Sequence, residues 1–269
     1  GTPLYVYSQR TIEGHFQRLD AALAPFRAEV DGALLDYARE GGFPEVWQLP
    51  DAARKIEYLM EQQVRKVLYE DLMTVGHYRK PENVLRFFVY LLSHPGTELN
   101  ISRIAKDAGV QKQVIEDNLP LLEKTDLILR VPKFSHQPLR VRQGNIKTYP
   151  IDMALRNAVL KTQSKLDDQM MGLYAENVVV RELMGWPERI ELAYYREKNR
   201  EVDCVLTHGG NRYLPLEVKH RRLSDQIHGL RSFMGRYKLR FGCVVTREQS
   251  ARFDEGILFL PLRWFLLGT

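Results

Sequence analysis

Apolar positions recur every three or four residues along most of the first half of the chain, which is the spacing of one face of an α-helix. The second such segment ends at Gly41-Gly42-Phe43-Pro44. Glycine accepts left-handed dihedrals and proline has no amide to continue a helix, so this motif is a stop signal. The pattern predicts helices over residues 9–26, 29–40, 51–74 and 82–93.

The next segment has the spacing of a helix-turn-helix. A small residue, Ala105, lets two helices approach, Gly109 takes the turn, and Ile115 anchors the second helix. Residues 127–131 and the stretch up to Tyr149 then alternate in the manner of a hairpin. The combination is typical of a winged helix. Such a fold binds DNA in some proteins and packs against protein in others, and a basic hairpin favours nucleic acid.

From Asp152 onward the pattern changes to mixed helix and strand. We therefore expect a fold of class α plus α/β: a helical, winged-helix N-terminal half followed by an α/β domain with a mixed central sheet. The predicted regions are residues 1–80, 81–150 and 151–269. In the last region the pattern predicts helices at 167–184, 223–237 and 248–253, and strands at 192–196, 201–206, 213–219, 241–246 and 257–260.

Strand alternation gathers charged residues on one sheet face. On residues 213–219, Glu217 and Lys219 share a face opposite the apolar side chains. On the preceding strand Glu201 and Asp203 do the same. If residues 208–212 form a five-residue hairpin loop, Asp203 falls opposite Glu217 and Glu201 opposite Lys219.

Helical spacing adds a third acid, because Glu176 interrupts the apolar stripe of its predicted helix. A carboxylate aimed into a core is costly unless a cation meets it. Asp203, Glu217 and Glu176 supply hard oxygen ligands of the kind that Mg²⁺ takes, and Lys219 could hold an attacking water. The simpler interpretation of Glu217 and Lys219 alone is an ion pair on a solvated face.

The net charge of +5 says little about partners, but two stretches are strongly basic. Such stretches suit a phosphate-binding surface, although each alone is also compatible with an ordinary solvated face. The candidate nucleic-acid-binding residues are Arg130, Lys133, Arg140, Arg142 and Lys147 in the first stretch, and Arg221 and Arg222 in the second.

Composition narrows the cellular setting. The chain has 269 residues, of which 27% are charged, and no apolar run reaches the roughly 18 residues that a membrane span needs. Two cysteines, Cys204 and Cys243, lie in apolar runs and cannot form a disulfide framework. We expect a cytoplasmic protein with reduced thiols and no membrane contact.

The order Glu176, then Glu201-Val202-Asp203, then Glu217-Val218-Lys219 resembles the core of PD-(D/E)xK, or restriction-endonuclease-like, nucleases. The resemblance implies an α/β nuclease fold that uses Mg²⁺ or Mn²⁺. It also implies site roles. The implied metal ligands are Asp203, Glu217, the Val218 carbonyl and Glu176, and the implied catalytic residues are Glu176, Asp203, Glu217, Lys219 and Gln226.

Two positions of this chain, Val202 and Gln226, match the family signature less directly. Val202 stands where the signature has proline, a change that bears on strand geometry rather than on chemistry. Gln226 is carried over because many members have a polar residue on the helix after the catalytic lysine.

Four motifs and the winged-helix stretch, over roughly residues 28–269, occur together in one protein family: Gly41-Gly42-Phe43-Pro44-Glu45-Val46, residues 149–155, residues 172–177, and Tyr195-Arg196. They resemble the C-terminal module of bacterial and archaeal AAA-type ATPases, long labelled a domain of unknown function. In those proteins a P-loop domain precedes the glycine-glycine-phenylalanine-proline motif. This chain has no Gly-x-x-x-x-Gly-Lys-Ser/Thr motif, so we expect no ATP site in it. The resemblance implies an ATPase partner domain, with residues 1–27 as its tail in a longer protein.

Three functions follow as hypotheses. The first is a Mg²⁺- or Mn²⁺-dependent nuclease acting on DNA, either linear or branched. The second is a non-catalytic module that binds nucleic acid or serves as an assembly platform for the ATPase. The third is a purely structural role in a homo-oligomer of the ATPase.

Overall fold

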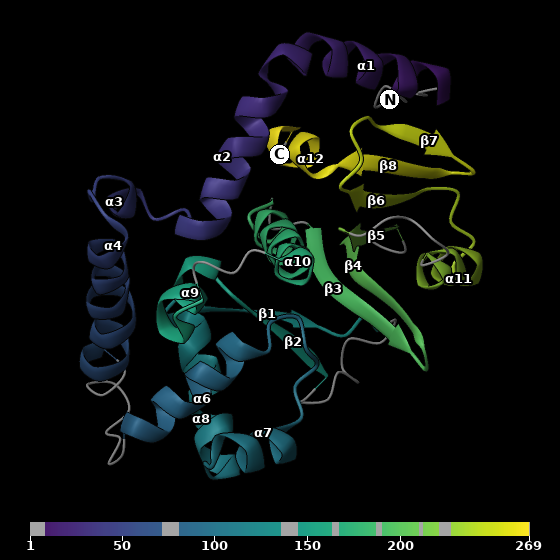
Figure 1. The fold of residues 1–269 in the computed structure, drawn as a ribbon. Coiled ribbons are helices and arrows are strands. Elements are labelled where there is room, and N and C mark those ends of the chain that lie inside the picture. The colour runs from purple at the N-terminus through teal and green to yellow at the C-terminus, as the bar shows by residue number, and fades with distance from the viewer. Residues whose placement is uncertain are drawn as a thin grey trace. The chain divides into compact units, whose positions relative to one another are not determined.

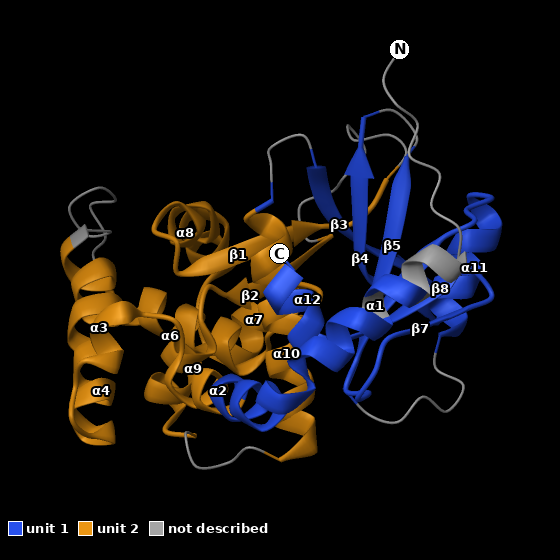
Figure 2. Ribbon diagram, turned by 90° about the horizontal axis from the view of Figure 1, so that it is seen from above, with its two compact units in different colours: residues 1–34, 186–269 blue, residues 35–185 orange. Residues whose placement is uncertain are grey.

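The computed structural model describes residues 9–71, 81–135, 145–162, 167–186, 190–209, 212–220 and 227–268. Gln226 and the candidate arginines Arg140, Arg142, Arg221 and Arg222 lie outside these ranges. The chain divides into two compact units, which are drawn in different colours in Figure 2. Unit 1 comprises residues 1–34 and 186–269, and unit 2 comprises residues 35–185. The predicted division at residues 80 and 150 stays a prediction.

A helical N-terminal half followed by a six-stranded mixed sheet confirms the expected fold class (Figure 1). The helices up to residue 93 cover the described parts of the four predicted segments, with the short α3 in addition. They are α1 (Gln9–Leu23), η1 (Ala24–Phe26), α2 (Arg27–Glu40), α3 (Pro44–Trp47), α4 (Ala52–Tyr58), η2 (Leu59–Asp71) and α6 (Pro81–Ser93).

Unit 2 has a core made by residues from α3 to α9. Phe87, Phe88 and Leu92 on α6 have no exposed surface, and they pack with Val64 of η2 and Leu155 of α9. Full burial of side chains of this size contributes roughly 1.5–3 kcal/mol each. The core therefore joins η2 and α6 to α9 within unit 2.

The predicted helix-turn-helix segment is present as two helices and a left-handed turn. Gly109 has φ of 66°, and Ile104 and Ile115 are buried on either side of it. An antiparallel two-stranded sheet follows, in which Leu129 pairs with Tyr149. The elements are α7 (Ile101–Ala108), α8 (Lys112–Lys124), β1 (Ile128–Pro132), β2 (Ile146–Pro150), α9 (Met153–Leu160) and α10 (Asp168–Met184).

Unit 1 is built on the mixed sheet with strand order β3-β4-β5-β6-β8-β7. The first three strands are antiparallel, β5, β6 and β8 run parallel, and β7 is an antiparallel edge strand. The elements are β3 (Ile190–Glu197), β4 (Arg200–His208), β5 (Tyr213–Lys219), α11 (His228–Arg236), β6 (Gly242–Thr246), β7 (Arg252–Asp254), β8 (Ile257–Pro261) and α12 (Leu262–Gly268).

Helix α11 covers the apolar face of β4. The Phe233 ring packs edge-on against Tyr195 at 4.8 Å between centroids, and Val202, the register partner of Tyr195, is fully buried. Gly229 allows the close approach, since a Cβ there would lie 1.9 Å from the carbonyl oxygen of Glu201. Glu201 and Asp203 are the neighbours of Val202 on β4, so their side chains point to the opposite face of the sheet.

Two predicted elements differ from the structure. Residues 248–253 were expected to form a short helix, but Arg252–Asp254 is strand β7, because it completes the sheet edge by pairing with β8. The helix predicted over 51–74 is α4 followed by the π-helix η2, as far as residue 71. In the described part of the chain, no helix is both long and apolar enough to cross a membrane.

Candidate functional site

The hairpin of β4 and β5 has the predicted register. Cys204 pairs with Leu216, and at the loop the amide of His208 donates to the carbonyl of Arg212 at 3.1 Å. Extended by one residue, this register places Asp203 opposite Glu217, as the loop length predicted. The regular pairing ends at Cys204, just before the two acids.

Glu217 is a buried carboxylate with one satisfied oxygen. Its side chain is 5% exposed, and Lys219 Nζ lies 2.6 Å from Oε1. Oε2 is buried and has no hydrogen-bond partner among the described residues. Burial, and secondly the charge of Asp203, raise the pKa of Glu217 to about 8 although Lys219 opposes the shift. A cation at Oε2 would satisfy this oxygen and favour the charged form.

Asp203 is also buried, with 9% of its surface exposed. Its Oδ2 accepts a hydrogen bond from the amide of Val218 at 2.8 Å, at the point where regular pairing between the strands has ended. The side chain thereby ties the end of β5 to β4. Asp203, Glu217 and Lys219 therefore form a compact group whose hard oxygens suit Mg²⁺ or Mn²⁺. Val218, whose carbonyl was predicted as a further ligand, belongs to the same strand.

Glu176 belongs to unit 2 and has partners there. Its Oε1 accepts a hydrogen bond from the Tyr149 hydroxyl at 2.8 Å, and Lys147 Nζ lies 3.5 Å from the same oxygen. The cation that sequence reasoning expected near this carboxylate is thus a lysine of β2. No group of three or more His, Cys, Asp or Glu residues able to hold a metal ion occurs within the described ranges.

Asp152 joins two of the motifs that carry the family resemblance. Its carboxylate accepts hydrogen bonds from the amide of Gly42 at 2.6 Å and from the amide of Ala154 at 2.8 Å. Asp152 therefore caps the N-terminus of α9 and links that helix to the glycine motif. Gly41 has φ of 80°, and a Cβ there would lie 2.5 Å from Asp152 Oδ1. Burial raises the pKa of Asp152, while both amides and Arg181 lower it.

The third motif, on α10, contacts the same segment. Asn177 Nδ2 donates to the carbonyl of Pro150 at 2.9 Å, next to the contact between Tyr149 and Glu176. Tyr174 donates to Asn157 Oδ1 at 2.6 Å, and Asn157 in turn contacts the carbonyl of Arg39. The motif residues of unit 2 therefore form a structural network that joins α2, β2, α9 and α10.

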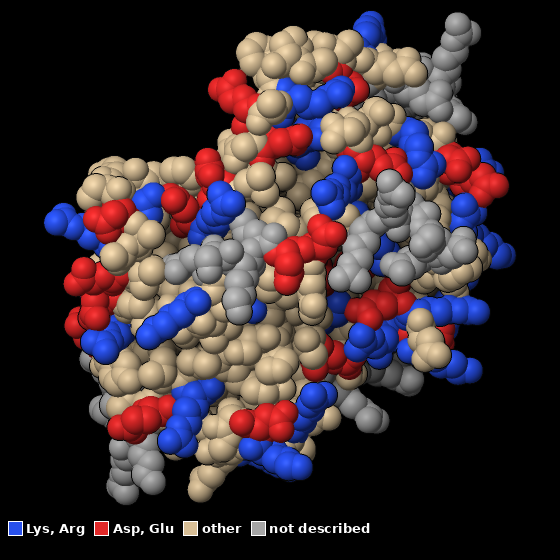
Figure 3. Space-filling model, in the orientation of Figure 1, with Lys and Arg blue, Asp and Glu red and all other residues tan. Residues whose placement is uncertain are grey.

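Two candidate nucleic-acid-binding residues have acidic partners. Arg130 lies 2.6 Å from Glu123, and Lys147 is 2% exposed and pairs with Glu176. Lys133 is half-buried at the end of the described part of this segment. Figure 3 shows Lys and Arg side chains interspersed with Asp and Glu over the face it draws. The basic character read from the sequence is thus reduced by acids from other segments.

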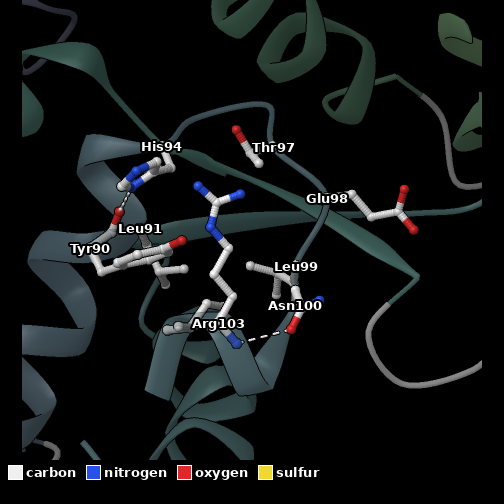
Figure 4. A pocket seen from close by; sticks show the side chains of 9 residues that line it. Tyr90, Leu91, His94, Thr97, Glu98, Leu99, Asn100 and Arg103 are labelled. Atoms are coloured by element: carbon white, nitrogen blue, oxygen red, sulfur yellow. Dashed lines mark hydrogen bonds between the residues drawn. The ribbon is translucent and has the colours of Figure 1, made fainter. Parts of the chain in front are cut away.

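A pocket of about 280 Å³ lies in unit 2 between α6 and the start of α7. Figure 4 shows the guanidinium of Arg103 directed toward the space between His94 and Thr97, with Glu98 pointing away. The rings of Tyr90 and His94 stack with centroids 4.2 Å apart. Sequence reasoning did not single out these residues, and their spacing carries no motif that could have found them.

Comparison with known proteins gives two family matches and no close relative. No curated protein and no solved structure matches the chain. Residues 171–265 match a domain of unknown function, DUF4143, which is often found at the C-terminus of AAA-type ATPases. Residues 32–166 match a second domain of unknown function, DUF8612. Because this second match spans half of its residues, the chain belongs to the DUF8612 family.

Proposed function

We propose that the chain is a metal-dependent nuclease module that acts on DNA, linear or branched, and works attached to an AAA-type ATPase. One observation carries the proposal: Glu217 is a buried carboxylate with an oxygen that lacks a partner in the described structure, and it lies beside Asp203 and Lys219. Burying a charge in this way is costly unless a cation compensates it.

Asp203 and Glu217 would hold Mg²⁺ or Mn²⁺, with the Val218 carbonyl as a further oxygen donor. When bound, the ion would lower the pKa of a water and neutralise charge on the phosphodiester. Lys219 Nζ, which pairs with Glu217 Oε1, would orient the attacking water and stabilise charge that develops on the phosphate. The amide of Val218 holds Asp203 Oδ2 and so fixes the orientation of that carboxylate.

The DNA-binding part of the proposal rests on unit 2. We infer a winged helix from the two helices α7 and α8, the left-handed Gly109 between them and the hairpin of β1 and β2. In helix-turn-helix proteins the second helix enters the major groove of DNA. The ATPase partner is inferred from the DUF4143 match and from the motif resemblance.

A non-catalytic module that binds nucleic acid or assembles with the ATPase is the second candidate. Two observations favour it. The described residues include no three-acid group able to hold a metal, and Glu176 is already engaged by Tyr149 and Lys147. In that case Glu217 and Lys219 form a structural ion pair and no DNA is cut.

Cleavage assays separate the two candidates. The purified chain is incubated with labelled duplex, single-stranded, forked and four-way DNA in Mg²⁺, Mn²⁺, Ca²⁺ or EDTA. We expect metal-dependent products from the wild type. Lys219→Ala should abolish cutting without loss of DNA binding, because Lys219 acts on charge that exists during the reaction.

Asp203→Asn should also abolish cutting, but through weaker metal binding, so that raised Mn²⁺ partly restores activity. Raised Mn²⁺ should not restore Lys219→Ala. Asp254→Asn, which changes an exposed acid on β7 in the same unit, is the matched control and should cut like the wild type. Absence of products from the wild type on every substrate would favour the non-catalytic module, and equal activity in all variants would point to a contaminant.

A further inference from the structure

Arg196 of β3 and Glu201 of β4 form an ion pair across the hairpin. The two residues are register partners. Arg196 Nε donates to Glu201 Oε2 at 2.9 Å, and a terminal guanidinium nitrogen donates to the same oxygen. Both side chains reach solvent, Arg196 with 40% and Glu201 with 29% of its surface exposed. The pair is thus accessible, unlike the carboxylate of Glu217.

The ion pair lies on the sheet face that carries Asp203 and Glu217. Side chains alternate along β4, so Glu201 and Asp203 share a face, whereas Val202 points toward α11. Glu201 is two residues from Asp203 on the same strand, and Asp203 Oδ2 accepts a hydrogen bond from the amide of Val218, the residue after Glu217. Arg196 therefore stands at the edge of the proposed nuclease centre.

The charge balance of this face shows what Arg196 contributes. With every carboxyl group ionised, the described charged residues around Asp203 are three carboxylates (Glu201, Asp203 and Glu217) and two cations (Arg196 and Lys219), which sum to minus one. A divalent ion reverses that sign, and one phosphodiester then brings the whole group to neutrality. Without Arg196 the same assembly would hold the phosphodiester with one uncompensated negative charge in a partly buried site.

We propose that Arg196 is a substrate-binding residue that takes a phosphate of the nucleic-acid backbone at the nuclease centre. This inference rests on the proposed function. Glu201 holds the guanidinium in place before the substrate arrives, and the phosphate competes with Glu201 for it. A planar guanidinium suits this role because it can bind two phosphate oxygens at once, and the Arg196 side chain is more exposed than that of Lys219, at 40% against 23%.

The test compares Arg196→Ala with Arg200→Ala. Arg200 is the matched control, because it begins the next strand and its guanidinium donates to Ser232 of α11 on the other side of the hairpin. DNA binding is measured by fluorescence anisotropy in Ca²⁺ over a range of salt, and cleavage is measured in Mg²⁺ and Mn²⁺. Arg196→Ala should weaken binding about ten-fold and lower the salt slope by about one unit, while Arg200→Ala changes neither.

A third variant excludes a merely structural role. Glu201→Gln also breaks the ion pair, but it removes a negative charge, so binding should stay equal or become tighter. If Arg196→Ala and Glu201→Gln weaken binding alike, or if Arg196→Ala binds as Arg200→Ala does, the inference is overturned. A wild type that cuts no DNA would refute the nuclease proposal, whereas the binding series would still decide the role of Arg196.

Discussion

Replacing Glu217 with Gln should make the protein more stable at alkaline pH. Gln has the same shape as a protonated Glu and carries no charge to bury. In the wild type, burial and the neighbouring Asp203 raise the pKa of Glu217 from 4.5 to about 8. A carboxyl group with a raised folded-state pKa contributes its full stability below 4.5 and loses it as the pH rises through about 8.

The size of the effect follows from that shift. Each pKa unit corresponds to about 1.4 kcal/mol, so the stability lost between pH 4.5 and 8 is on the order of 5 kcal/mol. The ion pair with Lys219 is already included in this shift, since its charge is one of the causes that oppose it. The variant should match the wild type near pH 4.5 and exceed it progressively toward pH 9.

Urea unfolding in EDTA, followed by tryptophan fluorescence at several pH values, measures the difference. Trp264 is buried in the same unit and reports its unfolding. Glu255→Gln is the control, because Glu255 is exposed and pairs with Arg231 at the surface, so its difference from wild type should stay small. A Glu217→Gln protein that is less stable than the wild type at pH 9, or a difference that does not change with pH, would refute the reasoning.

Two further predictions concern unit 1. Gly229→Ala should destabilise the protein by about 1–3 kcal/mol or more, because its Cβ would overlap the backbone of Glu201. Gly235→Ala on the same helix has open space around the new Cβ and should stabilise the protein by up to about 1 kcal/mol. Thermal unfolding of the two variants checks this contrast. Cys204 and Cys243 should resist iodoacetamide in the native protein and react in denaturant, since both are buried and burial raises the pKa of Cys243 to about 12. Rapid alkylation at neutral pH without denaturant would contradict this prediction and show that the sheet opens.

The β4–β5 hairpin shows what the sequence could predict. Loop length and strand alternation are local quantities, and together they predict the register in which Cys204 pairs with Leu216, which sets Asp203 opposite Glu217 when extended by one residue. The left-handed turns at Gly41 and Gly109 were predictable for the same reason, because a positive φ is a local demand that glycine meets.

Contacts between distant segments were not predictable. Lys147 lies in a stretch without acids, yet it is buried against Glu176, which is 29 residues further along the chain. Helical spacing put Glu176 on the apolar face of its helix, but it could not identify Tyr149 as the hydrogen-bond partner of that carboxylate. Such pairings depend on how elements pack, and a single sequence without homologues contains no signal for them.

The prediction of a helix over residues 248–253 was wrong for a related reason. Its spacing suits a short helix, but β8 offers an unpaired edge, and Arg252 covers Phe259 of that strand with its guanidinium carbon 3.5 Å from the ring centroid. Hydrogen bonds to a neighbouring strand outweigh a weak local preference. The π-helix η2 could not be told from an α-helix by apolar spacing, since both wind the chain with similar periods.

The most direct measurement is a titration of the wild type and Glu217→Gln with Mn²⁺, in which electron paramagnetic resonance counts the free ion. In the proposed site, Asp203 and Glu217 bind a divalent cation, and one ligand is the buried oxygen of Glu217 that has no partner among the described residues. We expect saturable binding of Mn²⁺ by the wild type, competition by Mg²⁺, and loss of that binding in the variant. Equal binding by both proteins, or no saturable binding by the wild type, would contradict the proposed site.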